Sequence, residues 1–139
     1  MTAKQFLSRG RWIEQEIQSL MKTRDETKDR LTSITQNYDS DGAQSSKDPH
    51  KFDALVELED KIDRKIDELY RIKNEILDTI FRLDDPRERM VLKGRYVDMQ
   101  TWEQIAVEMS YSYMQVTRIH GYALNSVKDV IECYTDSVV

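Results

Sequence analysis

The sequence has few residues that cross-link or break the chain, and it has no long apolar run. Its 139 residues include one cysteine, two prolines and four glycines. A single cysteine, Cys133, excludes an internal disulfide framework and is typical of a reducing compartment; we expect a partly buried small hydrophobe near the end of the last helix. No stretch approaches the roughly 20 apolar residues that span a bilayer, and the N-terminus lacks the apolar core of a signal peptide. We therefore expect a cytoplasmic protein without membrane contact.

Residue groups typical of catalysis or metal binding are also scarce. His50 and His120 are the only histidines, and no glycine-rich loop is present to bind phosphates. No Cys, His or carboxylate grouping has metal-ligand spacing. Asp39 and Asp41 lie in a polar stretch, but an EF-hand would need further oxygen ligands and a closing glutamate. We expect no enzymatic activity, no cofactor and no metal site.

The net charge of -5 is the opposite of the basic footprint that nucleic-acid binders usually carry. Any contact with DNA must therefore be local. The most basic short stretch contains Arg87, Arg89, Lys93 and Arg95, which we predict to contact phosphates. A solvated helix face is the alternative interpretation of these four residues.

Helical periodicity is what the sequence does contain. Charged residues make up 34% of the chain, which together with the scarcity of Gly and Pro predicts an all-α protein. Thr2 and Gln5 have the spacing of a capping box, so a helix is predicted to start almost at the first residue. A heptad-like apolar stripe follows, weakened by Gly10, Arg24 and Thr27; its members are Phe6, Ile13, Ile17, Leu20, Leu31, Ile34 and Tyr38. Residues 37–48 lack an apolar period and are predicted to form a flexible loop.

A second long helix is predicted after this loop. Asp48 is the expected N-cap and Pro49 the first helical residue. Apolar residues recur every seven positions at Leu55, Ile62, Leu69, Ile76 and Leu83, with Phe52, Ile66 and Ile80 between them. The two helices predict an antiparallel, coiled-coil-like hairpin over residues 1–83. The pattern does not decide whether the seam is filled within one chain or by a second copy, as in a homodimer.

A second unit is predicted over residues 84–139. Asp85 is the expected N-cap of a short helix, with Pro86 at its first position. The apolar side of this helix comprises Met90, Val91, Leu92, Tyr96 and Val97. After a turn at 98–100, Thr101 and Gln104 have the spacing of a capping box and start the next helix.

Residues 102–124 have the pattern of a helix-turn-helix. Ala106 lies where the two helices approach most closely, since a larger side chain there would force them apart. Ser110 stands at the turn, where glycine is commonest, and Tyr111 would bury its ring beside it. The inner faces are expected to comprise Ile105 and Met109 of the first helix and Val116 and Ile119 of the second.

If the second of these helices enters a major groove, its N-terminal end and outer face reach the base edges. The candidate base-contacting residues are Ser112, Tyr113, Gln115, Thr117 and Arg118. Arg118 suits guanine and Gln115 suits adenine, while His120 lies further along and is a candidate phosphate contact. Met114 fits either a base-facing or a packing position. An ordinary exposed helix residue is the alternative for each of these candidates.

Residues 84–124, DDPRERMVLKGRYVDMQTWEQIAVEMSYSYMQVTRIHGYAL, resemble region 4 of the sigma-70 factors as it occurs in small phage-encoded regulators of late transcription. In such modules a basic helix ending in an aromatic residue, here 87–96, precedes the helix-turn-helix. The upstream hairpin, with its serine-containing loop, is similar to the N-terminal part of the same phage proteins. The resemblance implies a sequence-specific DNA-binding regulator, expected to be an activator, of phage or prophage late genes for packaging and morphogenesis. Such a protein would act with the host RNA polymerase in the cytoplasm of a Gram-positive bacterium.

Two other functions fit the same residues. The acidic net charge favours a protein-interaction module that binds RNA polymerase or a sigma factor without reading DNA. The DNA-recognition subunit of a phage terminase also combines a helix-turn-helix with coiled helices. The sequence leaves the operator, the sign of regulation and the oligomeric state open.

Overall fold

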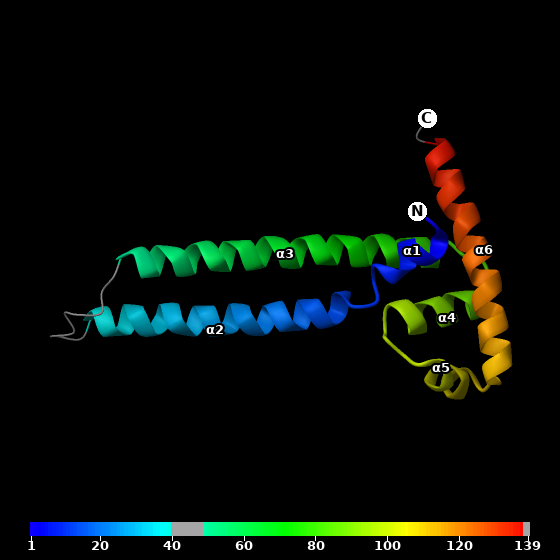
Figure 1. Cartoon of the computed structure of the whole chain (residues 1–139), viewed down its shortest axis with the longest axis horizontal. Coiled ribbons are helices and arrows are strands. Elements are labelled where there is room, and N and C mark those ends of the chain that lie inside the picture. The colour runs from blue at the N-terminus through cyan, green and yellow to red at the C-terminus, as the bar shows by residue number, and fades with distance from the viewer. Residues whose placement is uncertain (40–48, 138–139) are drawn as a thin grey trace. The chain divides into compact units, whose positions relative to one another are not determined.

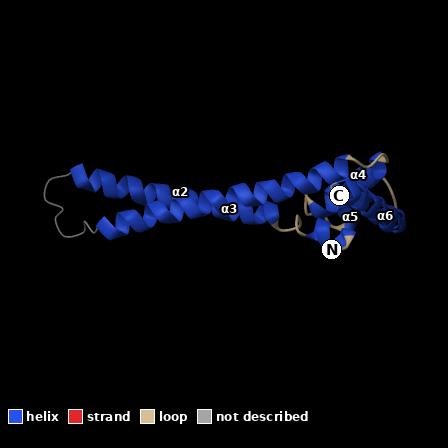
Figure 2. Cartoon of the chain, turned by 90° about the horizontal axis from the view of Figure 1, so that it is seen from above, coloured by secondary structure: helices blue, strands red, loops and turns tan. Residues whose placement is uncertain are grey.

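The computed structural model describes residues 1–39 and 49–137 (Figure 1). These residues form α-helices and, within the described ranges, no strand (Figure 2), which confirms the all-α prediction. The helices are α1 (Ala3–Ser8), α2 (Ile13–Asp39), α3 (Pro49–Phe81), α4 (Pro86–Tyr96), α5 (Trp102–Met109) and α6 (Tyr113–Ser137).

Contacts between residues divide the chain into two compact units. The hairpin unit comprises Gln15–Leu69, and the terminal unit comprises Met1–Glu14 together with Tyr70–Val139. The N-terminal segment therefore belongs by its contacts to the same unit as the C-terminal helices. A domain division after Leu83, as judged from the sequence, stays a prediction.

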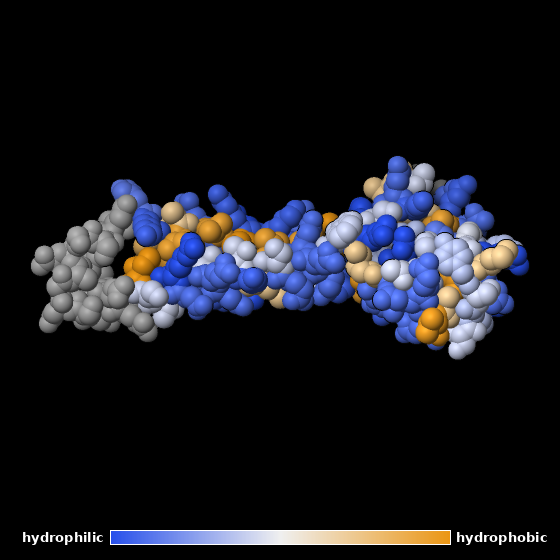
Figure 3. Space-filling view, turned by 60° about the horizontal axis from the view of Figure 1, so that its bottom comes forward, coloured by the Kyte–Doolittle hydropathy of each residue, from blue (hydrophilic) through white to orange (hydrophobic). Residues whose placement is uncertain are grey.

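In the hairpin unit, α2 and α3 run alongside each other in opposite directions (Figures 1 and 2). Arg24 lies 3.4 Å from Asp63, and Lys28 lies 3.8 Å from Glu59. The later residue of α2 is thus paired with the earlier residue of α3, as in antiparallel helices. The seam buries the predicted positions Ile17, Leu55, Ile62, Ile66 and Leu69. A narrow band of hydrophobic side chains is visible along the hairpin between hydrophilic rows (Figure 3).

Two polar residues, Arg24 and Thr27, interrupt the apolar seam of the hairpin. Thr27 is 4% exposed, and its hydroxyl donates to the Thr23 carbonyl at 2.8 Å. The half-buried Arg24 donates through one terminal nitrogen to Asp63, while its Nε is buried without a partner. The hydroxyl bond removes most of the cost of burying Thr27, but Arg24 stays a weak point of the packing.

The prediction of one continuous helix and stripe from Thr2 to the loop is wrong. The Thr2–Gln5 capping box is present, but α1 ends at Ser8 and α2 begins at Ile13. Gly10 lies in the intervening turn, where a Cβ would be 2.9 Å from Ile76 Cδ1 and 3.1 Å from the Tyr96 carbonyl oxygen. This close approach turns the chain and takes Phe6 out of the hairpin stripe, into the core of the terminal unit.

Other local expectations are corrected or fall outside the described residues. Residues 37–39 are helical in α2 and not part of a loop; residues 40–48, with the expected N-cap Asp48, lie outside the described ranges. Phe52 is 41% exposed and Met90 is 50% exposed, so neither packs into the core as expected. Cys133 is likewise exposed.

The terminal unit has two neighbouring cores. One joins α1, the C-terminal part of α3, α4 and α6; its members include Leu7, Ile76, Ile80, Leu92, Tyr96, Ala123 and Val127. The other joins α4, α5 and α6 through Val91, Ile105, Ala106 and Val116. Each fully buried aliphatic side chain contributes about 1.5–3 kcal/mol. Because α4 and α6 contribute to both cores, they hold α5 and the start of α6 in a fixed arrangement.

Candidate nucleic-acid interface

The helix-turn-helix predicted from the sequence is formed by α5, a tight turn and α6. Thr101 and Gln104 form the predicted capping box at the start of α5. Ser110 ends that helix with φ 59° and ψ 38°, a left-handed conformation that favours glycine. Ala106, 8% exposed, lies with Val116 in the core between the two helices. The expected roles of Ala106 and Ser110 are confirmed, while Tyr111 is only half-buried.

The helix-turn-helix has a second capping box, at the start of α6, which was not predicted from the sequence. The Ser112 hydroxyl accepts from the Gln115 backbone N–H at 3.2 Å, and the Gln115 side-chain oxygen accepts from the Ser112 backbone N–H at 2.8 Å. The Ser-x-x-Gln spacing of residues 112–115 was the signal that could have revealed it. Gln115 therefore has a structural role, and its amide NH₂ and second oxygen lone pair are what a base contact would use.

The candidate base-contacting residues lie at the N-terminal end of α6. Ser112, Tyr113, Gln115 and Arg118 are exposed, and Thr117 is half-buried with its hydroxyl donating to the Met114 carbonyl at 3.0 Å. Met114 is 68% exposed, so it faces solvent and does not pack. By the helical period, Met114, Arg118 and Gly121 share the stripe opposite the buried Val116 and Ala123. A Cβ on Gly121 would meet nothing within 4 Å, so this stripe is open.

A shallow pocket of about 270 Å³ adjoins this surface. Gln115, Arg118 and Tyr122 of α6 line it, with Arg87 of α4 and Tyr111 of the turn. The structure thus brings two predicted base contacts and one predicted phosphate contact to one place. Tyr122, 61% exposed, was not singled out from the sequence.

The four basic residues of α4 do not share one face. Successive residues of a helix are rotated by roughly 100°, which puts Arg87 and Arg95 on one side and Arg89 and Lys93 on the other. Two of them form ion pairs within the unit, since Arg87 lies 3.2 Å from Asp85 and Lys93 lies 2.9 Å from Asp98. The hydrogen bond from Arg87 lowers the pKa of Asp85.

The other two basic residues of α4 contact neutral groups. Arg89 donates to the Leu83 carbonyl. The Arg95 guanidinium lies 4.4 Å from the centre of the Trp102 ring and donates to the Gln100 carbonyl at 3.4 Å. These contacts fix the direction of both side chains without neutralising their charge, and the phosphate roles of all four residues stay predictions.

His120 is packed on the inner side of α6. Its Nε2 lies 2.7 Å from the Tyr96 hydroxyl oxygen, and the Trp102 ring meets the imidazole edge-on with centroids 4.7 Å apart. Burial, together with the charges of Lys4 and Arg95, lowers the pKa of His120 to about 4. At pH 7 the imidazole is neutral, so the predicted phosphate contact would be an uncharged hydrogen bond.

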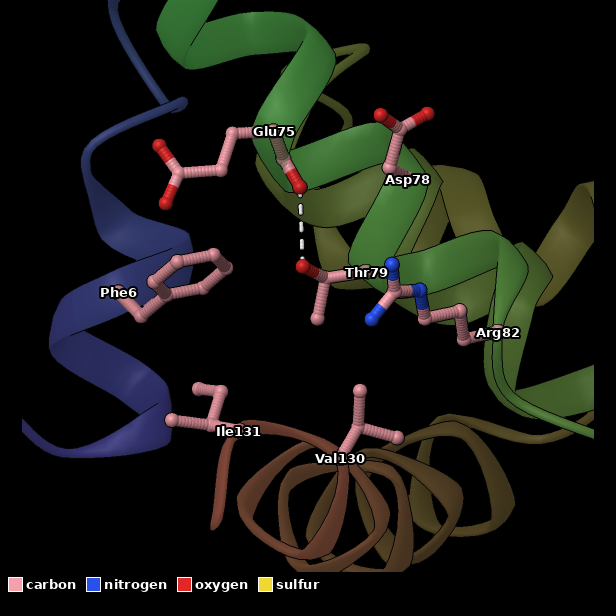
Figure 4. Close-up of a pocket in the computed structure, with 7 residues that line it drawn as sticks. All are labelled: Phe6, Glu75, Asp78, Thr79, Arg82, Val130 and Ile131. Carbon is pink, nitrogen blue, oxygen red and sulfur yellow. Dashed lines mark hydrogen bonds between the residues drawn. The ribbon is translucent and has the colours of Figure 1, made fainter. Parts of the chain in front are cut away.

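A larger pocket of about 410 Å³ lies elsewhere in the terminal unit, between α1, α3 and α6 (Figure 4). Phe6 of α1 lines one side of it, Val130 and Ile131 of α6 lie opposite α3, and the α3 residues of the lining include Glu75, Thr79 and Arg82. Arg9 forms an ion pair with Glu75 at 3.6 Å. None of the predicted DNA-contacting residues lines this pocket.

The described residues contain neither a metal-binding cluster nor a membrane-spanning helix. No group of three or more His, Cys, Asp or Glu side chains there could hold a metal ion. No helix in the described ranges has the length and apolar character to cross a membrane.

The family Sigma-70, region 4 matches residues 85–129. The matched residues comprise α4, α5 and much of α6, so a sigma-70 region 4 domain is present in this part of the chain. The match supports a DNA-binding helix-turn-helix regulator. Neither the curated proteins nor the solved structures contain a match to the chain.

Proposed function

We propose that the protein is a sequence-specific activator of phage or prophage late genes that binds promoter DNA and acts with the host RNA polymerase in the bacterial cytoplasm. The observation that carries the proposal is the open outer stripe of α6, which lies on a helix-turn-helix of the region 4 type. The late-gene context comes from the resemblance to phage regulators.

Base reading is assigned to the start of α6. Arg118 is exposed on the outer stripe and has the fork of donors that suits guanine O6 and N7. Gln115 presents its amide beside Arg118, which suits adenine N6 and N7. Tyr113, 49% exposed, provides a ring for a thymine methyl group, and Ser112 and Thr117 complete the surface.

Phosphate contacts must come largely from outside the helix-turn-helix. Between Thr101 and Val127 the charged side chains are Glu103, Glu108 and Arg118, because His120 is neutral at pH 7. One cation is too few for a DNA affinity that depends on neutralising several phosphates. The basic residues of α4 are therefore part of the proposed interface.

A specific observation favours a protein partner in addition to DNA. Val107 on α5 is 80% exposed, and the acidic Glu103 and Glu108 lie beside it. An acidic surface repels phosphates, so this face is suited to a protein, as expected for an activator that contacts RNA polymerase. If α6 did not read DNA, this face would carry the alternative function of a polymerase-binding module.

The test combines DNA selection with transcription. The purified protein would be used to enrich a random duplex pool, and its affinity for the enriched duplex would be compared with that for unrelated DNA at fixed salt. We expect a preference of 10³-fold or more, on the order of that of other specific DNA binders. Run-off transcription with bacterial RNA polymerase from a promoter carrying the site should then increase. Specific binding without any change in transcription would favour the terminase-like alternative, and equal binding to both duplexes would refute promoter reading.

A further inference from the structure

Three cationic side chains of the terminal unit belong to segments that pack on one another, since α1, α4 and α6 share one core and Gly10 packs on the end of α4. Lys4 belongs to α1, Arg11 to the turn before α2, and Arg95 to α4. Gly10, which precedes Arg11 in the sequence, packs closely on Tyr96, which follows Arg95. A Cβ on Gly10 would lie 3.1 Å from the carbonyl oxygen of Tyr96. The charges of Lys4 and Arg95 act on His120, and those of Arg11 and Arg95 act on Tyr96.

Some basic residues of the terminal unit have a carboxylate partner, and these three cations do not. Arg9, Arg87 and Lys93 of the same unit each have a carboxylate within 4 Å. Among the described residues, no carboxylate lies within salt-bridge distance of Lys4, Arg11 or Arg95. Tyr96 and His120, on which these charges act, are neutral at pH 7: a phenol is neutral there in any case, and burial lowers the pKa of His120 to about 4. The cluster is thus a concentration of unbalanced positive charge in a protein of net charge -5.

The cluster adjoins the start of the helix-turn-helix. Arg95 lies over the ring of Trp102, which is the first residue of α5, and Trp102 in turn contacts His120 of α6. When the second helix of such a motif reads the major groove, the first helix crosses the sugar–phosphate backbone. Arg95, beside the first residue of α5, is therefore suited to a phosphate contact.

We propose that Lys4, Arg11 and Arg95 form a phosphate-binding patch that contacts the DNA backbone while α6 reads the bases. The inference rests on the proposed function and extends it, because it assigns part of the DNA interface to the N-terminal segment, outside the residues matched by the region 4 family. The patch provides the charge that the helix-turn-helix lacks.

The test replaces the two N-terminal cations and leaves Arg95, which packs on Trp102, in place. The variant Lys4→Gln/Arg11→Gln keeps much of the side-chain length and removes two charges. The matched control is Lys22→Gln/Lys61→Gln, which removes two exposed lysines from the hairpin unit. Affinities of the full chain for an enriched duplex and for an unrelated duplex would be measured over a salt series, with circular dichroism to check the fold. A single variant, Lys4→Glu, provides a second measurement that leaves the turn at Arg11 intact.

Each phosphate contact contributes roughly 0.9 to the magnitude of the negative slope of log affinity against log salt. The double variant should therefore make the slope shallower by about 2. The control should keep the wild-type slope, and the preference for the enriched duplex should stay the same. A wild-type slope for both the double variant and Lys4→Glu, with the preference intact, would overturn the patch and leave the proposed function standing. If the wild type shows no preference but the double variant still lowers the slope, promoter reading fails and the patch stands as a sequence-independent DNA contact.

Discussion

The Tyr96 hydroxyl oxygen and His120 Nε2 lie 2.7 Å apart and connect the end of α4 to the first third of α6. The two rings stack with centroids 5.7 Å apart, and the Trp102 ring of α5 contacts the imidazole edge-on. The three helices of the helix-turn-helix region thus meet at one polar contact next to their apolar cores. This contact orients α6 because a partly buried hydrogen bond is costly to leave unmade.

The first prediction concerns pH. His120 has a pKa of about 4 in the folded protein and 6.5 in the unfolded chain, so below pH 6.5 the unfolded chain takes up the proton first. The free energy of unfolding should therefore fall as the pH decreases from about 6.5 to about 4. Urea unfolding at several pH values should show a smaller fall for His120→Gln than for the wild type. Equal falls for the two proteins would contradict the prediction.

The second prediction separates base reading from helix capping at the start of α6. Arg118→Ala should reduce the specific DNA affinity by about 1–3 kcal/mol with no change in helix content. Gln115→Glu keeps an oxygen that can accept from the Ser112 N–H, as in a capping box, but it loses the amide donor. It should therefore keep the melting temperature and lose specific affinity, whereas Gln115→Ala should lose both. Full specific affinity in Arg118→Ala and Gln115→Glu would remove this surface from the interface.

The third prediction tests the seam of the hairpin unit. Ile66 is 4% exposed on α3, so Ile66→Asp would bury an unpaired charge and should cost about 3–5 kcal/mol of unfolding free energy. Leu58→Asp on the same helix is the matched control. Leu58 is 41% exposed, so the carboxylate of an aspartate introduced there would stay hydrated. Thermal unfolding followed by circular dichroism compares the two. A melting temperature of Ile66→Asp equal to that of the control would show that the seam is not packed as described.

The fourth prediction compares two helical glycines. A Cβ on Gly94 of α4 would lie 2.7 Å from Gln100 Oε1 and 3.1 Å from Ile105 Cγ1, so Gly94→Ala should destabilise the contact between α4 and α5 by about 1–3 kcal/mol. Gly121→Ala on α6 meets no neighbour and should stabilise the protein by up to about 1 kcal/mol through helix propensity. Opposite shifts in melting temperature are expected. A stabilised Gly94→Ala would mean that α4 and α5 are less closely packed.

Features that act within one helical turn could be predicted from the sequence. The capping boxes at Thr2 and Thr101 and the N-cap at Asp85 are present because each needs only a side chain and a backbone N–H two or three residues away. The apolar period of α3 likewise identifies buried seam positions such as Ile62 and Ile66, since the pitch of the helix alone brings them to one face. The turn at Ser110 follows from the same local geometry.

Which basic side chains are paired, and which face of the helix each one occupies, could not be predicted in this way. The local density of Arg and Lys pointed to α4, but Arg87 and Lys93 have carboxylate partners, and the helical period separates the four residues onto two sides. Likewise, His120 is polar by type but neutral at pH 7, because its pKa depends on burial by residues from α4 and α5.

By itself the sequence determined the all-α class, the caps at Thr2, Asp85 and Thr101 and the helix-turn-helix, because these depend on residues close together along the chain. Only the tertiary structure decided that Phe6 leaves the hairpin for the terminal core and that the charges of Lys4 and Arg11 act on His120 and Tyr96. The close packing of Gly10 against Ile76 and the Tyr96 carbonyl turns the chain at that point. Segments more than eighty residues apart, at Gly10 and Tyr96, then pack on each other, and the local sequence pattern carries no signal of such a contact.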